Sequence, residues 1–375
     1  MAMIIRSGRR DESKIQDSVY DLDYLRHQSR WIRDDLDPQV ARSGPDALHS
    51  DDCLKLDEFL RRLLTSNISL DDIRFSRLHK ALATISGQAT RWPGRLIDRA
   101  DAVLAIWENN YGSLKRLPIP LYEPGGRLYG ICRPEDLNRE KLIIKWLKEV
   151  GVKLSPMHAR RVGDLGFKPG DWWINPLFAF RDGIIDSGEP AGGVVSDDRG
   201  AYAVLMTEEE EVNGPSPDAF TYRAREHDRG RYRLTSATRE SRQPVRILRS
   251  HSLRSFWAPR AGIRYDGLHV VVGWSISASP KTKRPVYEIQ FKRLDSELKM
   301  SIVLRRPFAD ELEDYREYKR LRQAMRESRH ENATPRIEVP LLEVSLDGSS
   351  GSASFSHSRR DSIRGLQGDD VGVWH

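Results

Sequence analysis

The chain has 375 residues and a formal net charge of +6, with 61 Lys and Arg against 55 Asp and Glu. This length allows two domains with hydrophobic cores, and the 38% hydrophobic and 31% charged residues indicate folded domains with polar tails. Its two cysteines, Cys53 and Cys132, lie far apart, which excludes RING, PHD and zinc-finger modules, because their zinc ions need clustered Cys and His ligands.

Nothing in the sequence indicates a membrane protein or a cofactor site. No apolar run approaches the length of a membrane span, and residues 1–6 are too few for the apolar segment of a signal peptide. Two distant cysteines fit a reducing compartment. We therefore expect a soluble intracellular protein without metal or cofactor, and the small basic excess favours an anionic partner.

The first half of the chain predicts an arm followed by helices. Residues 1–50 are rich in Arg, Asp, Ser and Gln, so we expect a disordered arm with a short helix near residues 20–32. Residues 51–155 carry apolar residues three and four positions apart, which predicts a small helical domain. The expected helices are marked by residues 56–64, 70–85, 96–107 and 138–150.

The second half changes to short runs rich in β-branched and aromatic residues, separated by Gly, Pro and Asp. Residues 156–307 therefore predict a β-rich, barrel-like domain. The expected strands are residues 177–180, 202–206, 245–248, 268–272 and 286–291. Residues 308–330 predict a helix whose alternating charges face solvent, and residues 331–375 a disordered tail.

Charge is distributed unevenly within the β-rich part. Residues 171–222 contain two basic and eleven acidic side chains, whereas residues 223–300 contain eighteen basic and seven acidic ones. Most of the basic side chains are arginines, whose planar fork suits phosphate oxygens and base edges. One interpretation is a surface that faces nucleic acid. The other is that these arginines pair with the acidic half of the same domain, and charge alone favours neither.

Short motifs occur in this region in a fixed order. They are Gly163-Asp-Leu-Gly166, Gly170-Asp-Trp-Trp173, Gly200-Ala-Tyr202, Phe220-Thr-Tyr222, Pro244-Val-Arg-Ile-Leu-Arg249, Arg264-Tyr-Asp-Gly267 and Val286-Tyr287. The ordered set, over residues 160–295, resembles the SRA-YDG (SET- and RING-associated) family. This resemblance implies an α+β protein with a PUA-like curved β-barrel. It also implies binding of DNA that contains 5-methylcytosine, with the modified base flipped into a pocket.

In the pocket of that family two tyrosines sandwich the base, an acid reads its Watson–Crick edge, and a threonine follows the second tyrosine. Carried over to this sequence, the second tyrosine is Tyr222, Asn213 replaces the acid and Arg223 replaces the threonine. The first tyrosine falls on Glu210, within a run of glutamates that would repel a DNA backbone. We predict base binding by Tyr222, Asn213 and Arg223 in a partly degraded pocket. Tyr222 can equally be interpreted as a core residue with a tethered hydroxyl.

Two further predictions concern the arginines and the turn. Arg225, Arg246, Arg249 and Arg264 are expected to contact the DNA backbone. The segment Tyr265-Asp266-Gly267 lies between turn formers and a β-branched run. We interpret it as a structural turn that holds the curvature of the sheet and does not touch the base.

The resemblance and the charge pattern lead to one main hypothesis and two alternatives. The main hypothesis is a nuclear chromatin protein that binds double-stranded DNA in the SRA-YDG manner. The first alternative is a non-catalytic scaffold for chromatin proteins that kept the fold and lost base recognition. The second is a metal-dependent nuclease, for which Asp295-Ser-Glu297-Leu-Lys299 offers acids and a lysine, although such a run is more often a charged strand end. We expect no enzymatic activity.

Overall fold

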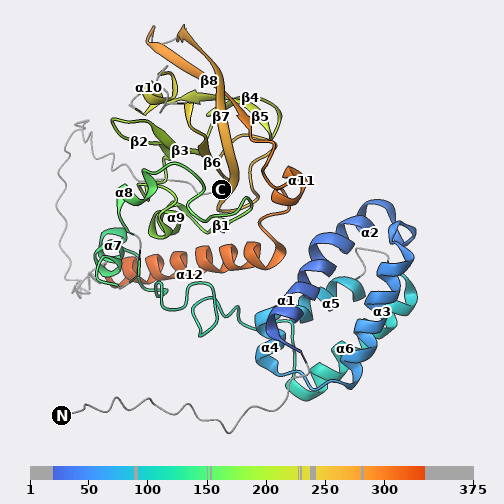
Figure 1. Cartoon of the computed structure of the whole chain (residues 1–375). Helices are drawn as coiled ribbons and strands as arrows, with labels where there is room; N and C mark the ends of the chain where they lie inside the picture. The colour runs from blue at the N-terminus through green and yellow to red at the C-terminus, as the bar shows by residue number, and fades with distance from the viewer. Residues whose placement is uncertain are drawn as a thin grey trace, which may run out of the picture. The chain divides into compact units, whose positions relative to one another are not determined.

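A computed structural model describes residues 20–87, 92–149, 151–152, 154–226, 228, 230–236, 242–279 and 283–333. The described residues up to Met325 belong to one compact unit that contains helices and an 8-stranded sheet (Figure 1). The predicted α+β class is confirmed. Residues 334–375 of the predicted tail lie outside the described residues. No helix in the described ranges is long and apolar enough to cross a membrane.

The N-terminal helices enclose a core of their own, which defines the helical domain (residues 20–117). They are α1 (Leu22–Arg30), the π-helix η1 (Trp31–Leu36), α2 (Asp37–Ser43), the 3-10 helix η2 (Pro45–Ala47), α3 (Ser50–Thr65), α4 (Leu70–Ser76), α5 (Leu78–Ser86) and α6 (Gly94–Tyr111). The short helix expected near residues 20–32 is confirmed by α1, and Leu25 and Ile32 are buried in this core. The disorder expected for the rest of the arm is wrong for its described part, because Leu36 and Val40 are buried there too. Their spacing suits one helix face, a pattern that the polar composition of the segment obscured. Residues 1–19 of the arm lie outside the described part.

The second predicted helix is in fact two helices. The first of them, α4, starts after Ser69, whose hydroxyl accepts a hydrogen bond from the Asp72 amide at 3.0 Å. It ends at Arg77, which adopts the left-handed conformation with φ of 61° and separates α4 from α5. The buried Arg77 guanidinium donates to Asp314 at 2.9 Å. The apolar spacing continues through this break, so periodicity alone could not reveal it.

The sheet follows the strand order β2-β3-β6-β7-β8-β5-β4, with β1 paired to β7. The strands are β1 (Trp172–Trp173), β2 (Gly193–Ser196), β3 (Ala201–Met206), β4 (Glu211–Ser216), β5 (Ala219–Ala224), β6 (Val245–Ser250), β7 (Ile263–Ala278) and β8 (Pro285–Arg293). Strands β3 and β6 are parallel, which makes the sheet mixed. The strand predicted at 177–180 is wrong, because these residues lie in α9 (Pro176–Asp182). The Asn175 side chain caps that helix by accepting hydrogen bonds from the amides of Leu177 and Phe178.

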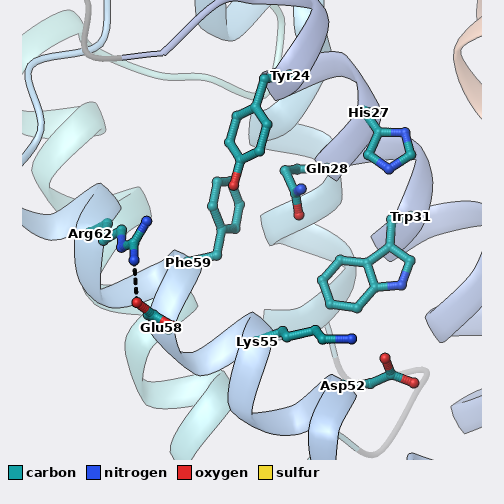
Figure 2. Close-up of a pocket in the computed structure, with 9 residues that line it drawn as sticks. All are labelled: Tyr24, His27, Gln28, Trp31, Asp52, Lys55, Glu58, Phe59 and Arg62. Carbon is teal, nitrogen blue, oxygen red and sulfur yellow. Dashed lines mark hydrogen bonds and ion pairs between the residues drawn. The ribbon is translucent and has the colours of Figure 1, made fainter.

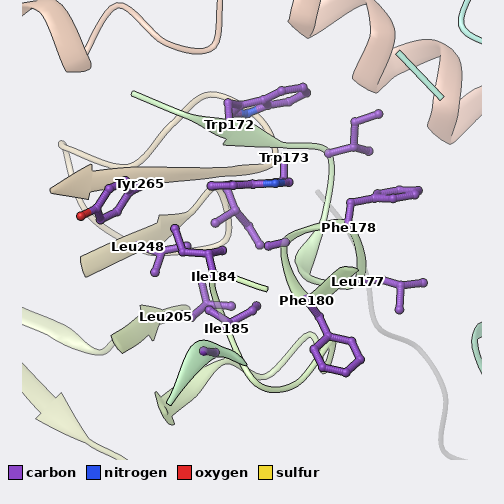
Figure 3. Close-up of a cluster of buried hydrophobic side chains, with 14 of the residues drawn as sticks. Trp172, Trp173, Leu177, Phe178, Phe180, Ile184, Ile185, Leu205, Leu248 and Tyr265 are labelled. Atoms are coloured by element: carbon purple, nitrogen blue, oxygen red, sulfur yellow. The ribbon is translucent and has the colours of Figure 1, made fainter. Parts of the chain in front are cut away.

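A second core joins the sheet to helices that precede and follow it in the chain. Figure 3 shows part of this core, including Trp172, Trp173, Phe178, Leu248 and Tyr265. The helices that add to it include α7 (Arg139–Trp146), α8 (Pro156–Ala159), α9 and α12 (Ala309–Ala333). The predicted boundary between residues 155 and 156 is therefore misplaced, because residues from Leu121 on pack with the sheet. We call residues 119–325 the β-domain; they also include the short helices α10 (Arg231–Leu234) and α11 (Met300–Val303).

The first turns of α12 are buried, contrary to the predicted solvated helix. Their carboxylates pair with arginines of the helical domain at 2.7, 2.6 and 2.9 Å: Asp310 with Arg30, Glu313 with Arg33 and Asp314 with Arg77. Each carboxylate thereby exchanges water for a guanidinium group. Alternating charges along a helix therefore do not by themselves distinguish a solvated face from a buried, paired one.

Candidate nucleic-acid interface

The segment Tyr265-Asp266-Gly267 belongs to β7 and lies inside the β-domain. Asp266 is fully buried, and its carboxylate accepts hydrogen bonds from Arg249 Nη1 at 2.5 Å and from Arg264 Nε at 2.6 Å. Gly267 follows with φ of 103°, beside a shift in register between β6 and β7. Such an irregularity bends the strand, and glycine tolerates the positive φ. The segment thus shapes the sheet around a buried ion cluster, in line with its structural interpretation.

This cluster corrects the prediction made for Arg249 and Arg264. Both guanidinium groups are buried. Arg249 is also bonded to Glu211 at 2.8 Å, and Arg264 donates to the Trp257 carbonyl at 2.6 Å. A contact with phosphate would require these buried pairs to break, which leaves charges unpaired inside the domain. The two arginines hold the fold, and their burial gives the predicted contacts with the DNA backbone no support.

Arg246 is buried as well, but without a carboxylate beside it. Its guanidinium donates to the carbonyls of Arg161 and Gly163, each at 2.7 Å, and to that of Ala159. Burial lowers the pKa of Arg246 to about 10, so the group stays protonated at neutral pH. Arg246 therefore fastens the segment after α8 to β6, and its burial on three carbonyls gives the predicted contact with the DNA backbone no support.

The three residues predicted to bind a base do not meet in one pocket. Tyr222 is buried in a core cluster, and its ring lies 6.4 Å from that of Phe291. Its neighbour on β5, Arg223, is exposed and bonded to Glu288 at 2.7 Å. Asn213 is exposed on β4, opposite Thr221. Because successive side chains of a strand point to opposite faces, Tyr222 lies on one face of the sheet and Arg223 with Asn213 on the other.

A cavity lies near the start of β2, and two of its lining residues, Arg225 and Asp228, interact electrostatically with Tyr222. It has a volume of about 360 Å³. Its lining residues are Ile185, Asp186, Ser187, Gly192, Gly193, Val194, Val195, Leu205, Arg225 and Asp228, and we call it the Gly193 cavity. Of the seven predicted site residues, Arg225 alone is among these. Gly193 has φ of 124°, a conformation that residues with a side chain rarely adopt, and a Cβ atom there would lie 2.9 Å from Asp228 Oδ2.

Glu210 pairs with Arg225 of the cavity lining and is buried, although the sequence suggested a repulsive surface glutamate. Its Oε1 is 2.6 Å from Arg225 Nε, and its Oε2 accepts a hydrogen bond from the Thr207 amide at 2.6 Å. Burial raises the pKa of Glu210 to about 7, against the opposing effects of the Thr207 amide and Arg225. The buried hydroxyl of Tyr222 interacts electrostatically with Glu210 and has no hydrogen-bond partner among the described residues.

We expect Glu210→Gln to raise the free energy of unfolding under alkaline conditions and to leave it nearly unchanged near pH 4. The folded-state pKa of Glu210 lies above its ordinary value of 4.5, so its favourable contribution is complete below that value and is lost as the pH rises through about 7. Glutamine keeps the acceptor for Thr207 and cannot ionise. Urea unfolding at both pH values tests this, with the exposed Glu209→Gln as control. Identical pH dependence in Glu210→Gln and the unmodified chain would contradict the prediction.

The acidic and basic halves of the β-domain pair with each other. Besides the pairs of Arg225 and Arg249, Arg254 bonds to Glu209, and Arg233 lies 3.3 Å from Asp198. These contacts agree with the second interpretation of the charge pattern, in which the arginines neutralise acids of their own domain. Their pairing also reduces the positive potential that a phosphate backbone would meet.

The residues proposed for a nuclease lie together around another hollow. Asp295, Glu297 and Lys299 line a cavity of about 380 Å³ with Asp218 and Lys292. Glu297 is occupied there, because its Oε1 accepts a hydrogen bond from the Leu268 amide at 2.9 Å. Within the described ranges, no three His, Cys, Asp or Glu side chains are grouped so that they could hold a metal ion.

The helical domain has a hollow of its own, between α1 and α3 (Figure 2). It has a volume of about 360 Å³, and the rings of Tyr24 and Phe59 meet edge to face in it at 6.1 Å. Figure 2 shows Trp31 on the far side of Gln28 from these rings. This hollow was not predicted from the sequence, although one of its walls lies in the short helix expected near residues 20–32.

Comparisons with known proteins found solved structures that are similar to part of the chain. No protein-family model and no curated protein matches it. The SUVH5 SRA domain, solved with hemi-methylated CG DNA, is 17% identical over 37% of this chain and 96% of that one, with a TM-score of 0.30. Arabidopsis thaliana SUVH6 is 19% identical over 46% of this chain and 36% of that one, with a TM-score of 0.35.

The modification-dependent TagI restriction endonuclease is also similar. It is 19% identical over 36% of this chain, with a TM-score of 0.32, and the chain spans about half (52%) of its length. Solved structures similar to this chain thus include an SRA domain, a member of the family that the ordered motifs resemble.

Proposed function

We propose that the β-domain binds double-stranded DNA and takes one modified base into the Gly193 cavity. The class of ligand follows from the ordered motifs that resemble the SRA-YDG family. The observation that carries the proposal is the cavity itself, because its wall places the charged side chains of Arg225 and Asp228 beside the close backbone of Gly192 and Gly193. A flipped base has to leave the stack and enter such a hollow.

The chemistry of the Gly193 cavity supports this assignment. A base edge presents both N–H donors and carbonyl acceptors. Arg225 offers donors at the cavity wall, whereas the carboxylate of Asp228 accepts. The Asp228 carboxylate is already held in place, because its Oδ2 accepts a hydrogen bond from the Val194 amide at 2.7 Å. The site would therefore hold the base through Arg225 and Asp228, with the unpartnered Tyr222 hydroxyl behind them.

Fluorescence anisotropy with unmodified, hemimethylated and fully methylated duplexes tests the proposal. We expect tighter binding of a methylated duplex and a steep loss of affinity with added salt. Ser187→Trp places an indole at the rim of the cavity and should reduce the preference for methylated DNA roughly tenfold, the size of one base-recognition contact. Ser296→Trp, at an exposed position outside the cavity lining, is the matched control. Equal binding of all three duplexes by the unmodified chain would overturn base recognition.

A protein-interaction scaffold is the second candidate function, and the paired charges of the β-domain favour it. Arginines of the basic half already form ion pairs with carboxylates of the acidic half, among them Arg225, Arg233, Arg249 and Arg254. Binding experiments distinguish the two candidate functions. A chain that binds no duplex at low salt, yet recovers a protein partner from nuclease-treated extract, would support the scaffold. Both functions imply a nuclear protein associated with chromatin, which imaging of a tagged chain would test.

A further inference from the structure

Strand β7 extends beyond the strand that covers it. It has 16 residues, but β6 pairs with it only over residues 263–269. Residues 270–278 are paired with β8 on one side, and among the described strands none pairs with them on the other. Figure 1 shows the long β7 and β8 arrows running on together beyond the shorter strands. The uncovered side, which we call the β7 edge, is a row of backbone donors and acceptors available for pairing.

The other edges of the sheet carry features that discourage pairing. Strand β2 has only 4 residues, and β4 begins with Glu211 and contains Pro215, which has no N–H to donate. Brevity, charge and proline are the usual means by which proteins protect an edge strand. The β7 edge, Val-Val-Val-Gly-Trp-Ser-Ile-Ser-Ala over residues 270–278, has none of the three.

The side chains along the β7 edge are also exposed. Val272, Trp274 and Ile276 are 58%, 45% and 55% exposed, and the residues beside them up to Ala278 are small or hydroxylated. A long, uncharged and apolar edge of this kind is a template for a further strand. Residues 270–278 extend over about 30 Å. Their pairing with β8 shifts register between Val271 and Gly273, so the edge offers a regular ladder of hydrogen bonds over residues 273–278.

We propose that the β7 edge is a dimerisation surface, on which a second copy of this chain adds its own β7 edge in antiparallel orientation. Self-pairing suits this segment because it carries no charge, so two copies meet there without the repulsion expected between chains of net charge +6. A twofold axis at Trp274 places Trp274 opposite its own copy and Val272 opposite Ile276. Each exposed large side chain then gains an apolar cross-strand neighbour. The inference does not depend on DNA binding.

Sedimentation velocity of the full chain over a wide range of concentrations tests the proposal. We expect a dimer that dissociates on dilution. Trp274→Lys and Ile276→Lys put a charge on the β7 edge and should each raise the dissociation constant at least about tenfold, which corresponds to about 1.4 kcal/mol. Val212→Lys is the matched control, because Val212 is 40% exposed on the protected β4 edge, and it should leave the dimer intact.

Hydrogen exchange gives a second measurement that does not depend on variants. The amides of residues 270–278 should exchange more slowly at concentrations where the chain is dimeric than where it is monomeric. Circular dichroism of the lysine variants checks that they remain folded. An unmodified chain that is monomeric at every concentration would overturn the proposal. So would a dimer that survives in both lysine variants, since it would be held together elsewhere.

Discussion

Asp266→Ala is expected to lower the free energy of unfolding by about 3–5 kcal/mol. The carboxylate lies between two guanidinium groups, those of Arg249 and Arg264, and all three residues are at most 1% exposed. Without it, one carboxylate, Glu211, remains for two buried cations, and Arg264 keeps only carbonyl acceptors. Unpaired buried charge is among the most costly defects that a substitution can create. Urea unfolding followed by tryptophan fluorescence measures the loss.

The pH dependence of the same variant provides a second test. Burial alone would raise the pKa of Asp266, but Arg264 and Arg249 outweigh it and lower that pKa below its ordinary value of 3.8. The stabilisation is therefore present above about pH 4 and is lost as the pH falls through the lower folded-state value. Asp266→Ala should lack this acid-dependent loss. Asp295→Ala, at an exposed position, is the control and should change stability by less than about 0.5 kcal/mol. A loss below about 1 kcal/mol for Asp266→Ala would contradict a structural role for the cluster.

Arg246→Met is expected to lower the free energy of unfolding by at least about 3 kcal/mol. Methionine has a similar length and keeps apolar contacts, but it cannot donate to the carbonyls of Ala159, Arg161 and Gly163. Three acceptors would then lack the donor that now binds them, and each buried group left without a partner costs free energy. Chemical unfolding again gives the value.

Measuring the DNA affinity of Arg246→Met distinguishes a structural role of Arg246 from a direct contact with DNA. Under conditions where Arg246→Met remains folded, its affinity for a duplex should equal that of the unmodified chain. Arg225→Met should behave in the opposite way, because Arg225 lines the Gly193 cavity: in the folded chain it should weaken binding of a methylated duplex. A folded Arg246→Met chain with markedly weakened binding would show that Arg246 reaches the DNA after all.

The sequence by itself determined the α+β class and most of the strands. Tyr202, Val245 and Val286 lie in strands as predicted, because β-branched and aromatic runs bounded by turn residues are a local signal. Helical spacing likewise located α3 and α6. The ordered motifs resembled a family with the same fold class. These features depend on neighbours in the chain, which a sequence shows directly.

The tertiary structure alone decided what the charged and aromatic residues do. Arg246 and Arg249 look the same in sequence as the exposed Arg223, yet the first two are buried by partners 17–87 positions away. Glu210 became a buried acid for the same reason, through Arg225. Local patterns fix the face on which a side chain lies, whereas its surroundings are set by segments distant in the chain. The Gly193 cavity is lined by residues 185–195 together with Arg225 and Asp228. Because these segments are distant in the chain, only the tertiary structure reveals it.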